Sequence, residues 1–570
     1  MAADITILLG KLREKPFYLD TAALTWVQET FASLSIEERV GQILLPVCRD
    51  LSETALDSVL AHHVGGLHRM IRREEGDLRR SAEYAQSQAK VPLLMAGDIE
   101  FSEKSSPAAG TEFPNQMTVG ATGDALHARR MGTIAAREGL YLGFNISWTP
   151  VGDLAINFRS SVVNTRAFGD NVDAVDMYVR AYHEGAREAG LATCLKHWPG
   201  DGVDERDQHF VTTHNDMDME SWRSSFGRIF GSAIANGVQT IMAGHISLPA
   251  YASELGVRAS CPMALPASLN GDLSLKLLRD ELRFNGVIVS DATGMVGFGS
   301  QGKRSELVPL CIESGCDILL FPTNIVDDFR FLMNGLDDGT LSRGRLNEAV
   351  LRVLALKASL GLHINKGSLP HEGSKSILLA SGQHAAWADE VARRSVTLVK
   401  DTQHILPLNP ERHHRVLLSW LENRRTPSGP IPQLQFDRLL REAGFDVTIL
   451  RSGGDIEPSR YDVGIYVMAE EGMSGREHLG PRWGDLHGPF PASMERLWHY
   501  LPTIYISLGS PFLLYHMPEC KTLVNAYSPV LPAQRAVVAA LTGALSFSGK
   551  NPVDPSCGLA GALPRQAGCG

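Results

Sequence analysis

A regular alternation of short apolar segments with longer amphipathic ones, over the first 325 residues, constrains the fold of this chain more than any other feature. Eight segments are short and almost wholly apolar, which is typical of strands in a sheet that is buried on both faces. They are residues 42–46, 65–69, 92–97, 145–150, 193–197, 240–245, 286–290 and 317–321. The intervening stretches, such as residues 172–189 and 220–236, have the spacing of amphipathic helices. Eight strand-then-helix units predict a (β/α)8 barrel of the TIM type.

The ends of the predicted strands favour this barrel over a doubly wound sheet, which would also alternate strands and helices. In a barrel the chemistry lies at the carboxyl ends of the strands, all on one rim. Five consecutive strands lead into ionisable side chains: Asp98 and Glu100 after the third, Asp153 after the fourth, Lys196 and His197 at the end of the fifth, His245 after the sixth and Asp291 after the seventh. This convergence and the count of eight predict a barrel with a functional rim.

A second α/β domain is expected after the barrel. The length of 570 residues exceeds what one hydrophobic core normally supports. Further strands are expected at residues 396–399, 416–420, 447–450, 463–468, 503–508 and 522–526. They predict a smaller α/β sandwich domain with a mainly parallel sheet. The expected organisation is a catalytic barrel (1–362), a linker and helix (363–394), the sandwich domain (395–558) and a frayed tail (559–570).

The composition restricts the partners that this chain can have. Its formal net charge of −10, from 64 acidic and 54 basic side chains, disfavours nucleic acid and anionic membranes. The first residues lack the basic region of a secretory signal, and no apolar run reaches the roughly 18 residues of a membrane span. The eight cysteines show no metal-ligand spacing, which is typical of thiols in a reducing compartment. We therefore expect a soluble cytoplasmic protein with a small-molecule substrate, and the oligomeric state stays open.

The loop after the fifth strand contains the strongest chemical signal. Asp207-Gln208-His209 places a carboxylate two residues from an imidazole. An aspartate that holds one ring nitrogen makes the other a proton donor and acceptor near neutral pH. His209, oriented by Asp207, is therefore the candidate acid/base. The alternative is an ion pair that only stabilises the loop.

Asp291 is the candidate nucleophile, because it directly follows a buried strand, precedes small residues and is expected to project inward. The alternative for Asp291 is the N-cap of the next helix. A carboxylate-rich rim suits a substrate dense in hydroxyls, and acetal cleavage needs a nucleophile and a separate acid. A metal site formed by His197, His209 and His245 is a further alternative, although no ligand spacing supports it.

Two of these motifs resemble the signature of a known enzyme family. Lys196-His197-Trp198-Pro199-Gly200-Asp201-Gly202, followed by Asp207-Gln208-His209, resembles the K-H-F-P-G-H-G and D-S-H motifs of glycoside hydrolase family 3, in its NagZ-like β-N-acetylglucosaminidase branch. Further matches are Asn164-Thr165-Arg166-Ala167-Phe168-Gly169-Asp170, Ala243-Gly244-His245-Ile246 and the strand that leads to Asp291. The resemblance covers most of residues 35–360, and residues 395–400 look like the start of the family's second domain.

The resemblance implies a retaining, exo-acting β-N-acetylglucosaminidase, that is, a β-N-acetylhexosaminidase that removes terminal N-acetylglucosamine from cell-wall or chitin-derived glycosides. It implies that Asp291 attacks the anomeric carbon, while His209, held by Asp207, protonates the leaving oxygen. The residues that match the family's sugar-holding positions are Asp98, Arg166, Lys196 and His197. The family needs no metal and no organic cofactor, so none is expected here.

The sequence departs from the family pattern in two places. After Asp98 the family continues Q-E-G-G-R-V-Q-R, whereas this chain has Ile99-Glu100-Phe101-Ser102-Glu103-Lys104-Ser105, and Asp201 stands where the loop motif has a second histidine. Both departures affect the identity of the sugar more than the reaction type. A histidine acid can carry a positive charge and tolerate an anionic acceptor such as phosphate, whereas a carboxylate would repel it. One open alternative is therefore a phosphorolytic β-N-acetylglucosaminide phosphorylase. The others are a β-glucosidase-like hydrolase and a catalytically silent sugar-binding protein.

Overall fold

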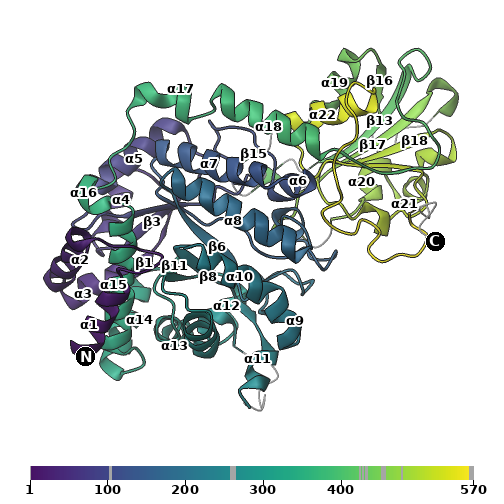
Figure 1. The fold of residues 1–570 in the computed structure, drawn as a ribbon. Coiled ribbons are helices and arrows are strands. Elements are labelled where there is room, and N and C mark those ends of the chain that lie inside the picture. Colours follow the sequence, from purple (N-terminus) through teal and green to yellow (C-terminus); the bar gives the residue numbers. More distant parts are fainter. Residues whose placement is uncertain are drawn as a thin grey trace.

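The computed structural model of the protein describes residues 2–101, 105–256, 265–422, 425–426, 429–430, 434–450, 457–476 and 479–563. Its first part is an α/β fold built on a curled parallel sheet (Figure 1). Seven strands pair side by side in the order β10-β8-β6-β5-β4-β3-β2, and all these pairs are parallel. These strands are β2 (Val47–Cys48), β3 (Gly66–Arg69), β4 (Leu94–Gly97), β5 (Ile146–Ser147), β6 (Ala192–Trp198), β8 (Thr240–Ala243) and β10 (Val287–Ser290).

Two short strands connect the ends of this sheet. β1 (Leu44–Leu45), directly before β2 in the chain, pairs in parallel with β11 (Leu319–Leu320). Val289 of β10 forms a parallel bridge to Ile318, the residue before β11. Each of the eight segments predicted as strands therefore contains a strand in the structure. Because neighbouring strands follow chain order without a reversal, the doubly wound alternative is wrong.

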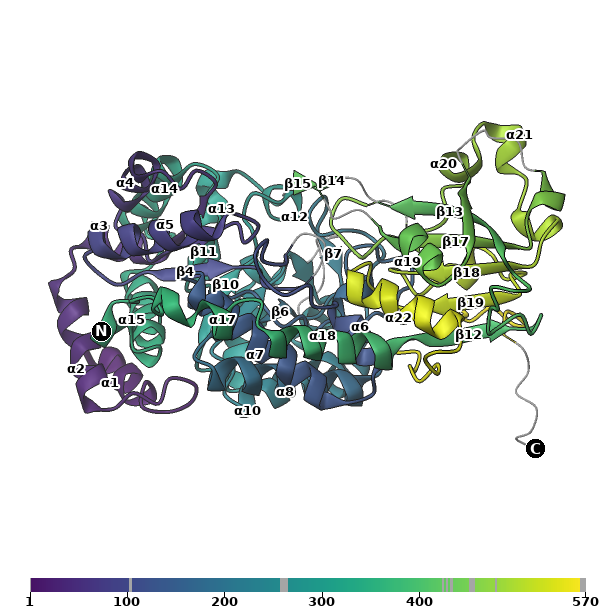
Figure 2. The same ribbon diagram turned by 90° about the horizontal axis from the view of Figure 1, so that it is seen from above.

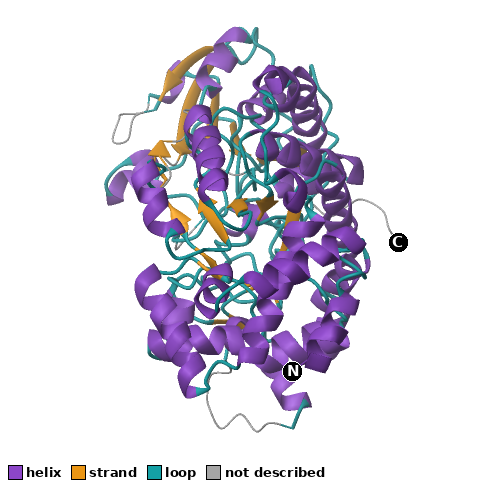
Figure 3. Cartoon of the chain, turned by 90° about the vertical axis from the view of Figure 1, so that its left-hand side faces the viewer, coloured by secondary structure: helices purple, strands orange, loops and turns teal. Residues whose placement is uncertain are grey.

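Helices surround the strands of this first part (Figure 3). The longer ones are α2 (Thr21–Ser33), α5 (Glu75–Gln88), α7 (Ala125–Tyr141), α8 (Val172–Glu188), α10 (Phe226–Ala235), η3 (Asp272–Glu281), α13 (Arg304–Glu313), α14 (Ile325–Asp338) and α15 (Arg343–Ser359). The side chain of Asn171 caps α8 by accepting from the backbone N of Ala174. Every third or fourth residue of α8 is then buried, as an amphipathic helix requires: Val175, Val179, Tyr182 and Ala186. The helix predicted at residues 220–236 is interrupted at Ser225, so that α9 (Met219–Ser224) precedes α10.

The second part contains a six-stranded sheet in the order β12-β19-β18-β17-β13-β16. β12 runs antiparallel to β19, whereas the other neighbours are parallel. The strands are β12 (Thr397–Asp401), β13 (Arg415–Glu422), β16 (Asp446–Ile449), β17 (Val463–Ala469), β18 (Thr503–Ser507) and β19 (Thr522–Asn525), with helices α19 (Phe436–Glu442) and α22 (Leu531–Leu541) beside them. All six predicted strands are present, and the sheet is mainly parallel as expected.

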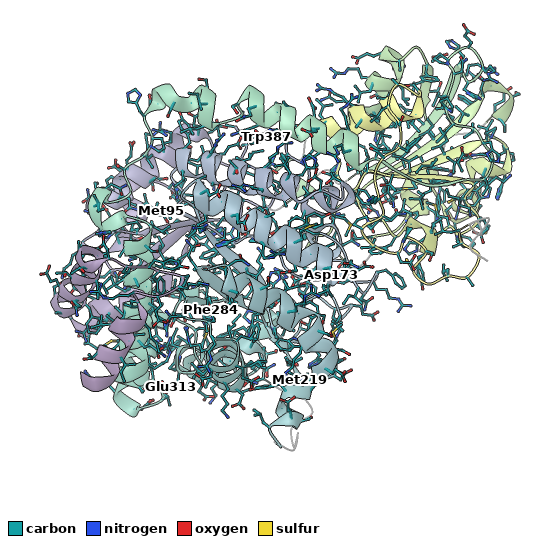
Figure 4. The ribbon with its side chains drawn as sticks, in the orientation of Figure 1. Met95, Asp173, Met219, Phe284, Glu313 and Trp387 are labelled. Atoms are coloured by element: carbon teal, nitrogen blue, oxygen red, sulfur yellow. The ribbon has the colours of Figure 1, made fainter. Side chains whose placement is uncertain are left out.

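The two sheets lie in separate hydrophobic cores. The first core extends from Leu8 to Val391 and the second from Ala392 to Leu541, so the change of core falls within α18 (Gly382–Ser395). Figure 2 shows α18 along the flank of the first part, ending beside the second. Trp387, labelled in Figure 4, holds it there, because the guanidinium of Arg130 on α7 lies 5.2 Å from its ring.

The expected frayed tail is partly packed. Of its residues, 559–563 are described, and Ala562 is 2% exposed in a satellite core of the second part. Residues 564–570 lie outside the described ranges, so the tail as a whole stays a prediction. Among the helices of the described ranges, none combines the length and the hydrophobicity needed to cross a bilayer.

Candidate active site

The carboxyl ends of β4, β6 and β10 meet at a cavity of about 190 Å³. Parallel strands of a curled sheet end on the same rim, so residues far apart in the sequence share this cavity. Six of the seven predicted site residues line it: Asp98, Arg166, Lys196, His197, His209 and Asp291. The placement of these side chains follows from the strand ends, and their roles stay predictions.

Asp207, the seventh predicted residue, does not line the cavity but binds His209 through the histidine's Nδ1 and backbone N. Its Oδ1 accepts from Nδ1 of His209 at 2.6 Å and from the backbone N of His209 at 2.9 Å. The carbonyl of His209 accepts from the backbone N of Val296 at 2.9 Å, which ties this loop to the turn after β10. Burial raises the pKa of Asp207, but the hydrogen bonds and charge of His209 outweigh it, and the net pKa is lowered. An ionised Asp207 fixes Nδ1 as the donor and leaves Nε2 available to a substrate.

Asp291 lies 8% exposed at the floor of the cavity, one residue beyond β10. Its Oδ1 accepts from the backbone N of Ala292 at 2.7 Å. Burial raises the pKa of Asp291, but the imidazoles of His197, His245 and His209 lower it, and the net shift is downward. The next helix, α12 (Val296–Gly299), starts after Met295, so the N-cap interpretation of Asp291 is wrong.

A network of charges forms one wall of the cavity. The carboxylate of Glu100 accepts a hydrogen bond from Nε of Arg166 at 2.5 Å. Nζ of Lys196 lies 3.2 Å from the carboxylate of Glu100 and 3.2 Å from that of Asp98. Burial raises the pKa of Glu100, yet Arg166 and Lys196 hold it far below its usual range. Burial lowers the pKa of Lys196, but Glu100 and Asp98 raise it above its usual value. The wall therefore presents fixed cations and carboxylates to a ligand, a pattern that suits paired hydroxyl groups.

His197 belongs to a second buried pair. Its Nδ1 lies 2.6 Å from Oδ2 of Asp153, and its backbone N donates to Oδ1 of Asp153 at 2.9 Å. Asp201, the residue that departs from the expected motif, lies beside this pair: its backbone N donates to Oδ1 of Asp153 at 2.8 Å, and its carboxylate accepts from Gln208 and from the backbone N of Gly202. Burial, and then the charge of Asp153, raise the pKa of Asp201 to about 7. Asp201 therefore supports this loop and does not line the cavity of about 190 Å³.

The three histidines proposed as metal ligands do not form a metal site. Within the described ranges, no group of three or more His, Cys, Asp or Glu side chains has the arrangement of metal ligands. His245 is instead occupied on both ring nitrogens, by Ser268 Oγ at 2.8 Å and the carbonyl of Ala292 at 3.0 Å. Burial lowers the pKa of His245, which fits a neutral ring in this position.

A segment of the second part, residues 471–476, completes the site, and the sequence reasoning missed it. It follows β17 and contributes Glu471, Gly472, Met473 and Ser474 to the cavity. Three backbone nitrogens attach it to the first part: Gly472 donates to Oγ1 of Thr165 at 2.7 Å, Met473 to the carbonyl of Ser161 at 2.8 Å, and Gly475 to Oδ2 of Asp207 at 2.9 Å. Asp207, and through it His209, is thus held partly by a loop of the second part.

Other lining residues were also absent from the predicted set. They are Glu100, Ser105, Trp148, Met242, Ala292, Leu320 and Phe321. Trp148 is fixed by its indole N–H, which donates to Nδ1 of His68 at 3.0 Å. Glu100 was expected at the rim together with Asp98, but it was not among the predicted sugar-holding residues. In the departing segment, residues 102–104 lie outside the described ranges, while Phe101 packs on Phe113 with ring centroids 5.4 Å apart.

Comparison with known proteins identifies the family. Residues 35–356 match the family model described as the Glycosyl hydrolase family 3 N terminal domain. The chain belongs to glycoside hydrolase family 3. As a member of this family the protein is a glycosidase, and the resemblance read from its motifs is confirmed.

Relatives of this family 3 glycosidase match it over nearly the whole chain. The Beta-N-acetylglucosaminidase/beta-glucosidase of Cellulomonas fimi is 38% identical, over 96% of this chain and 98% of that protein. The structure of Beta-glucoside phosphorylase BglX is 32% identical, with a TM-score of 0.91 over 97% of this chain and 99% of the other. A family 3 beta-N-acetylglucosaminidase from Paenibacillus sp. str. FPU-7 is 24% identical and shares the fold, with a TM-score of 0.80 over 92% of this chain and 100% of the other.

Proposed function

We propose that this family 3 glycosidase removes a terminal β-linked N-acetylglucosamine by a retaining mechanism. One observation carries the proposal: His209, braced by Asp207 at 2.6 Å, and the buried Asp291 line the same small cavity. A retaining enzyme needs a nucleophile and a separate acid on either side of one glycosidic bond. A cavity of about 190 Å³ is suited to a single sugar ring, which supports exo action. The first part, with β1 and β11 in the ring of strands, is then a complete (β/α)8 barrel, followed by the α/β sandwich domain.

The residues have distinct roles in this mechanism. Asp291 attacks the anomeric carbon as the bond to the aglycone oxygen breaks, and Nε2 of His209 gives that oxygen its proton. In the second step His209 takes a proton from the incoming acceptor, which displaces Asp291 and restores the original anomeric configuration. Asp98 and Glu100 accept from sugar hydroxyls, while Lys196 and Arg166 donate to sugar oxygens. Arg166 and Lys196 lower the pKa of Glu100, and neighbouring imidazoles lower the pKa of Asp291, so both act as carboxylates in this scheme.

The choice of N-acetylglucosamine rests on the Lys196–Gly202 and Asp207–His209 motifs and on the name of the Cellulomonas fimi relative, which also includes beta-glucosidase. The test measures kcat/KM for the 4-nitrophenyl β-glycosides of N-acetylglucosamine and glucose. We expect the first to be the better substrate. A clear preference for glucose would replace the proposed sugar but leave the roles of Asp291 and His209 intact. Turnover that survives Asp291→Ala would refute the mechanism itself.

Phosphate is a second candidate acceptor in place of water. Two observations favour it: the acid/base is an imidazole, which repels an anion less than a carboxylate does, and the phosphorylase BglX is 32% identical with a TM-score of 0.91. Phosphate attack on the glycosyl-enzyme would give a sugar 1-phosphate of retained configuration. Product analysis by ³¹P NMR, with and without phosphate, separates the two reactions. Free sugar as the sole product at saturating phosphate would exclude phosphorolysis.

A further inference from the structure

Asp201 and Gln208 stand where the K-H-F-P-G-H-G and D-S-H motifs have a histidine and a serine. In the structure these two residues bond to each other, since Nε2 of Gln208 donates to Oδ2 of Asp201 at 3.1 Å. Both are buried, with 2% of Asp201 and 1% of Gln208 exposed. A buried amide and a buried carboxylate each need hydrogen-bond partners, so each departure from the motif helps to satisfy the other.

The bond closes the loop that carries the proposed acid/base. Asp201 lies three residues beyond β6, and Gln208 lies between Asp207 and His209. The side chain of Gln208 is buried, whereas that of His209 is 35% exposed and lines the cavity of about 190 Å³, the sugar cavity. The backbone at His209 is therefore anchored from its buried side, and this anchor sets where the imidazole lies.

The polarity of the bond is fixed by backbone groups at both ends. Oε1 of Gln208 accepts from the backbone N of His245 at 2.8 Å, so its amide nitrogen faces Asp201. Oδ1 of Asp201 accepts from the backbone N of Gly202 at 2.7 Å, which leaves Oδ2 for Gln208. Gln208 must therefore be the donor and Asp201 the acceptor.

Asp201 also connects this loop to the wall of the sugar cavity. Its backbone N donates to Oδ1 of Asp153 at 2.8 Å, and Oδ2 of Asp153 lies 2.6 Å from Nδ1 of His197. His197 lines the sugar cavity, as His209 does. One connected set of contacts, from His197 through Asp153 and Asp201 to Gln208, thus places a sugar-cavity residue and the acid/base loop relative to each other.

We propose that Asp201 and Gln208 form a positioning pair that holds His209 where it can protonate the leaving oxygen. Neither member of the pair lines the sugar cavity, so both act through His209. The proposal rests on the proposed function, because the pair can affect turnover in this way only if His209 is the acid.

The test breaks the bond and then restores it with reversed polarity, without changing the size of either side chain. In Asp201→Asn, either orientation of the asparagine amide leaves two N–H donors facing each other, at Gln208 or at Gly202. Adding Gln208→Glu removes this conflict, because the asparagine amide then donates to the glutamate. The double variant also keeps the net charge of the wild type.

The assay measures kcat/KM for phenyl and 2,4-dinitrophenyl N-acetylglucosaminides, or for the corresponding glucosides if glucose is the better sugar. Only the phenyl substrate needs a full proton from His209. We expect Asp201→Asn to lose about tenfold on the phenyl substrate and no more than about twofold on the other. The double variant should return to within about twofold of the wild type on both. Turnover of the 2,4-dinitrophenyl substrate also shows that each variant is folded.

Asp176→Asn is the matched control, because Asp176 is a buried aspartate on α8 whose partner is Arg180 at 3.3 Å. It should leave the ratio of the two rates unchanged. An Asp201→Asn variant with no loss, with equal losses on both substrates, or with a loss that Gln208→Glu does not recover would overturn the proposal. Failure of the wild type to cleave any of these glycosides would instead count against the proposed function.

Discussion

Replacing Asp207 by asparagine tests how His209, the proposed acid/base, is held. Oδ1 of Asp207 accepts two hydrogen bonds from His209, and Oδ2 accepts a third from the backbone N of Gly475. Asparagine can keep the bonds to His209 through its carbonyl, but its amide then faces the N–H of Gly475. The variant loses the negative charge that stabilises a protonated imidazole, and it loses the hydrogen bond to residue 475.

The expected size of the effect follows from the lost charge. A hydrogen bond to a charged group contributes about 1 kcal/mol more than its neutral counterpart, so the two bonds from His209 lose about 2 kcal/mol together, which corresponds to roughly 30-fold in rate. The loss should depend on the leaving group, since only a poor leaving group needs a full proton from His209. The assay measures kcat/KM for phenyl and 2,4-dinitrophenyl N-acetylglucosaminides. We expect about a 30-fold loss for the first and a loss of no more than about threefold for the second.

Asp204→Asn is the control for this experiment. Asp204 lies in the same loop, but its partners are Arg206 and the backbone N of His214, and no contact joins it to His209. It should leave the leaving-group dependence unchanged. An equal loss for both leaving groups in Asp207→Asn would show that Asp207 acts on something other than the proton transfer, and would refute the reasoning.

Three further changes are expected to have defined results. Asp291→Ala should abolish turnover, and added azide should restore it by forming a glycosyl azide of opposite anomeric configuration. Hydrolysis by this variant at a rate near that of the wild type, without azide, would exclude Asp291 as the nucleophile. Thr165→Val removes the acceptor of the 2.7 Å bond from Gly472 and should raise KM about threefold to tenfold with kcat little changed, as steady-state kinetics can show. Lys357 is fully buried, and its Nζ donates to Oε1 of Gln42 at 2.7 Å. Burial lowers the pKa of Lys357 to about 7. The unfolded chain keeps that proton up to about pH 10.4, so folding stability should rise by about 2 kcal/mol between pH 7 and pH 9, and thermal unfolding of Lys357→Met should lack this rise.

The strand pattern of the first part was readable because a parallel sheet covered on both faces needs continuous apolar segments. Segments 193–197 and 286–290 each end in the residues that reach the cavity, so the positions of Lys196, His197 and Asp291 followed from the fold. The pair Asp207 and His209 was readable for a different reason, since both partners lie within three residues of each other. Local chemistry of this kind leaves a signal in the sequence alone.

Contacts between distant segments were beyond such reasoning. Glu100, Arg166 and Lys196 form one charge network, but nothing in their spacing shows that a single carboxylate bridges both cations. The burial of Ala562, within the segment predicted as a frayed tail, likewise depends on a surface formed by other residues. The predicted helix at residues 220–236 also breaks at Ser225, whose φ of −114° and ψ of −96° lie outside the helical region.

By itself, the sequence determined the alternation of strands and helices, the residues at the strand ends and the family to which they belong, because each depends on neighbours along the chain. The tertiary structure alone decided that residues 471–474 line the cavity of about 190 Å³ and that Gly475 donates to Asp207. It also decided that Arg159 and Tyr515, more than 300 positions apart, form a hydrogen bond. The physical reason is that backbone periodicity is a local property, whereas a site between two sheets exists only where their separate cores bring the loops together.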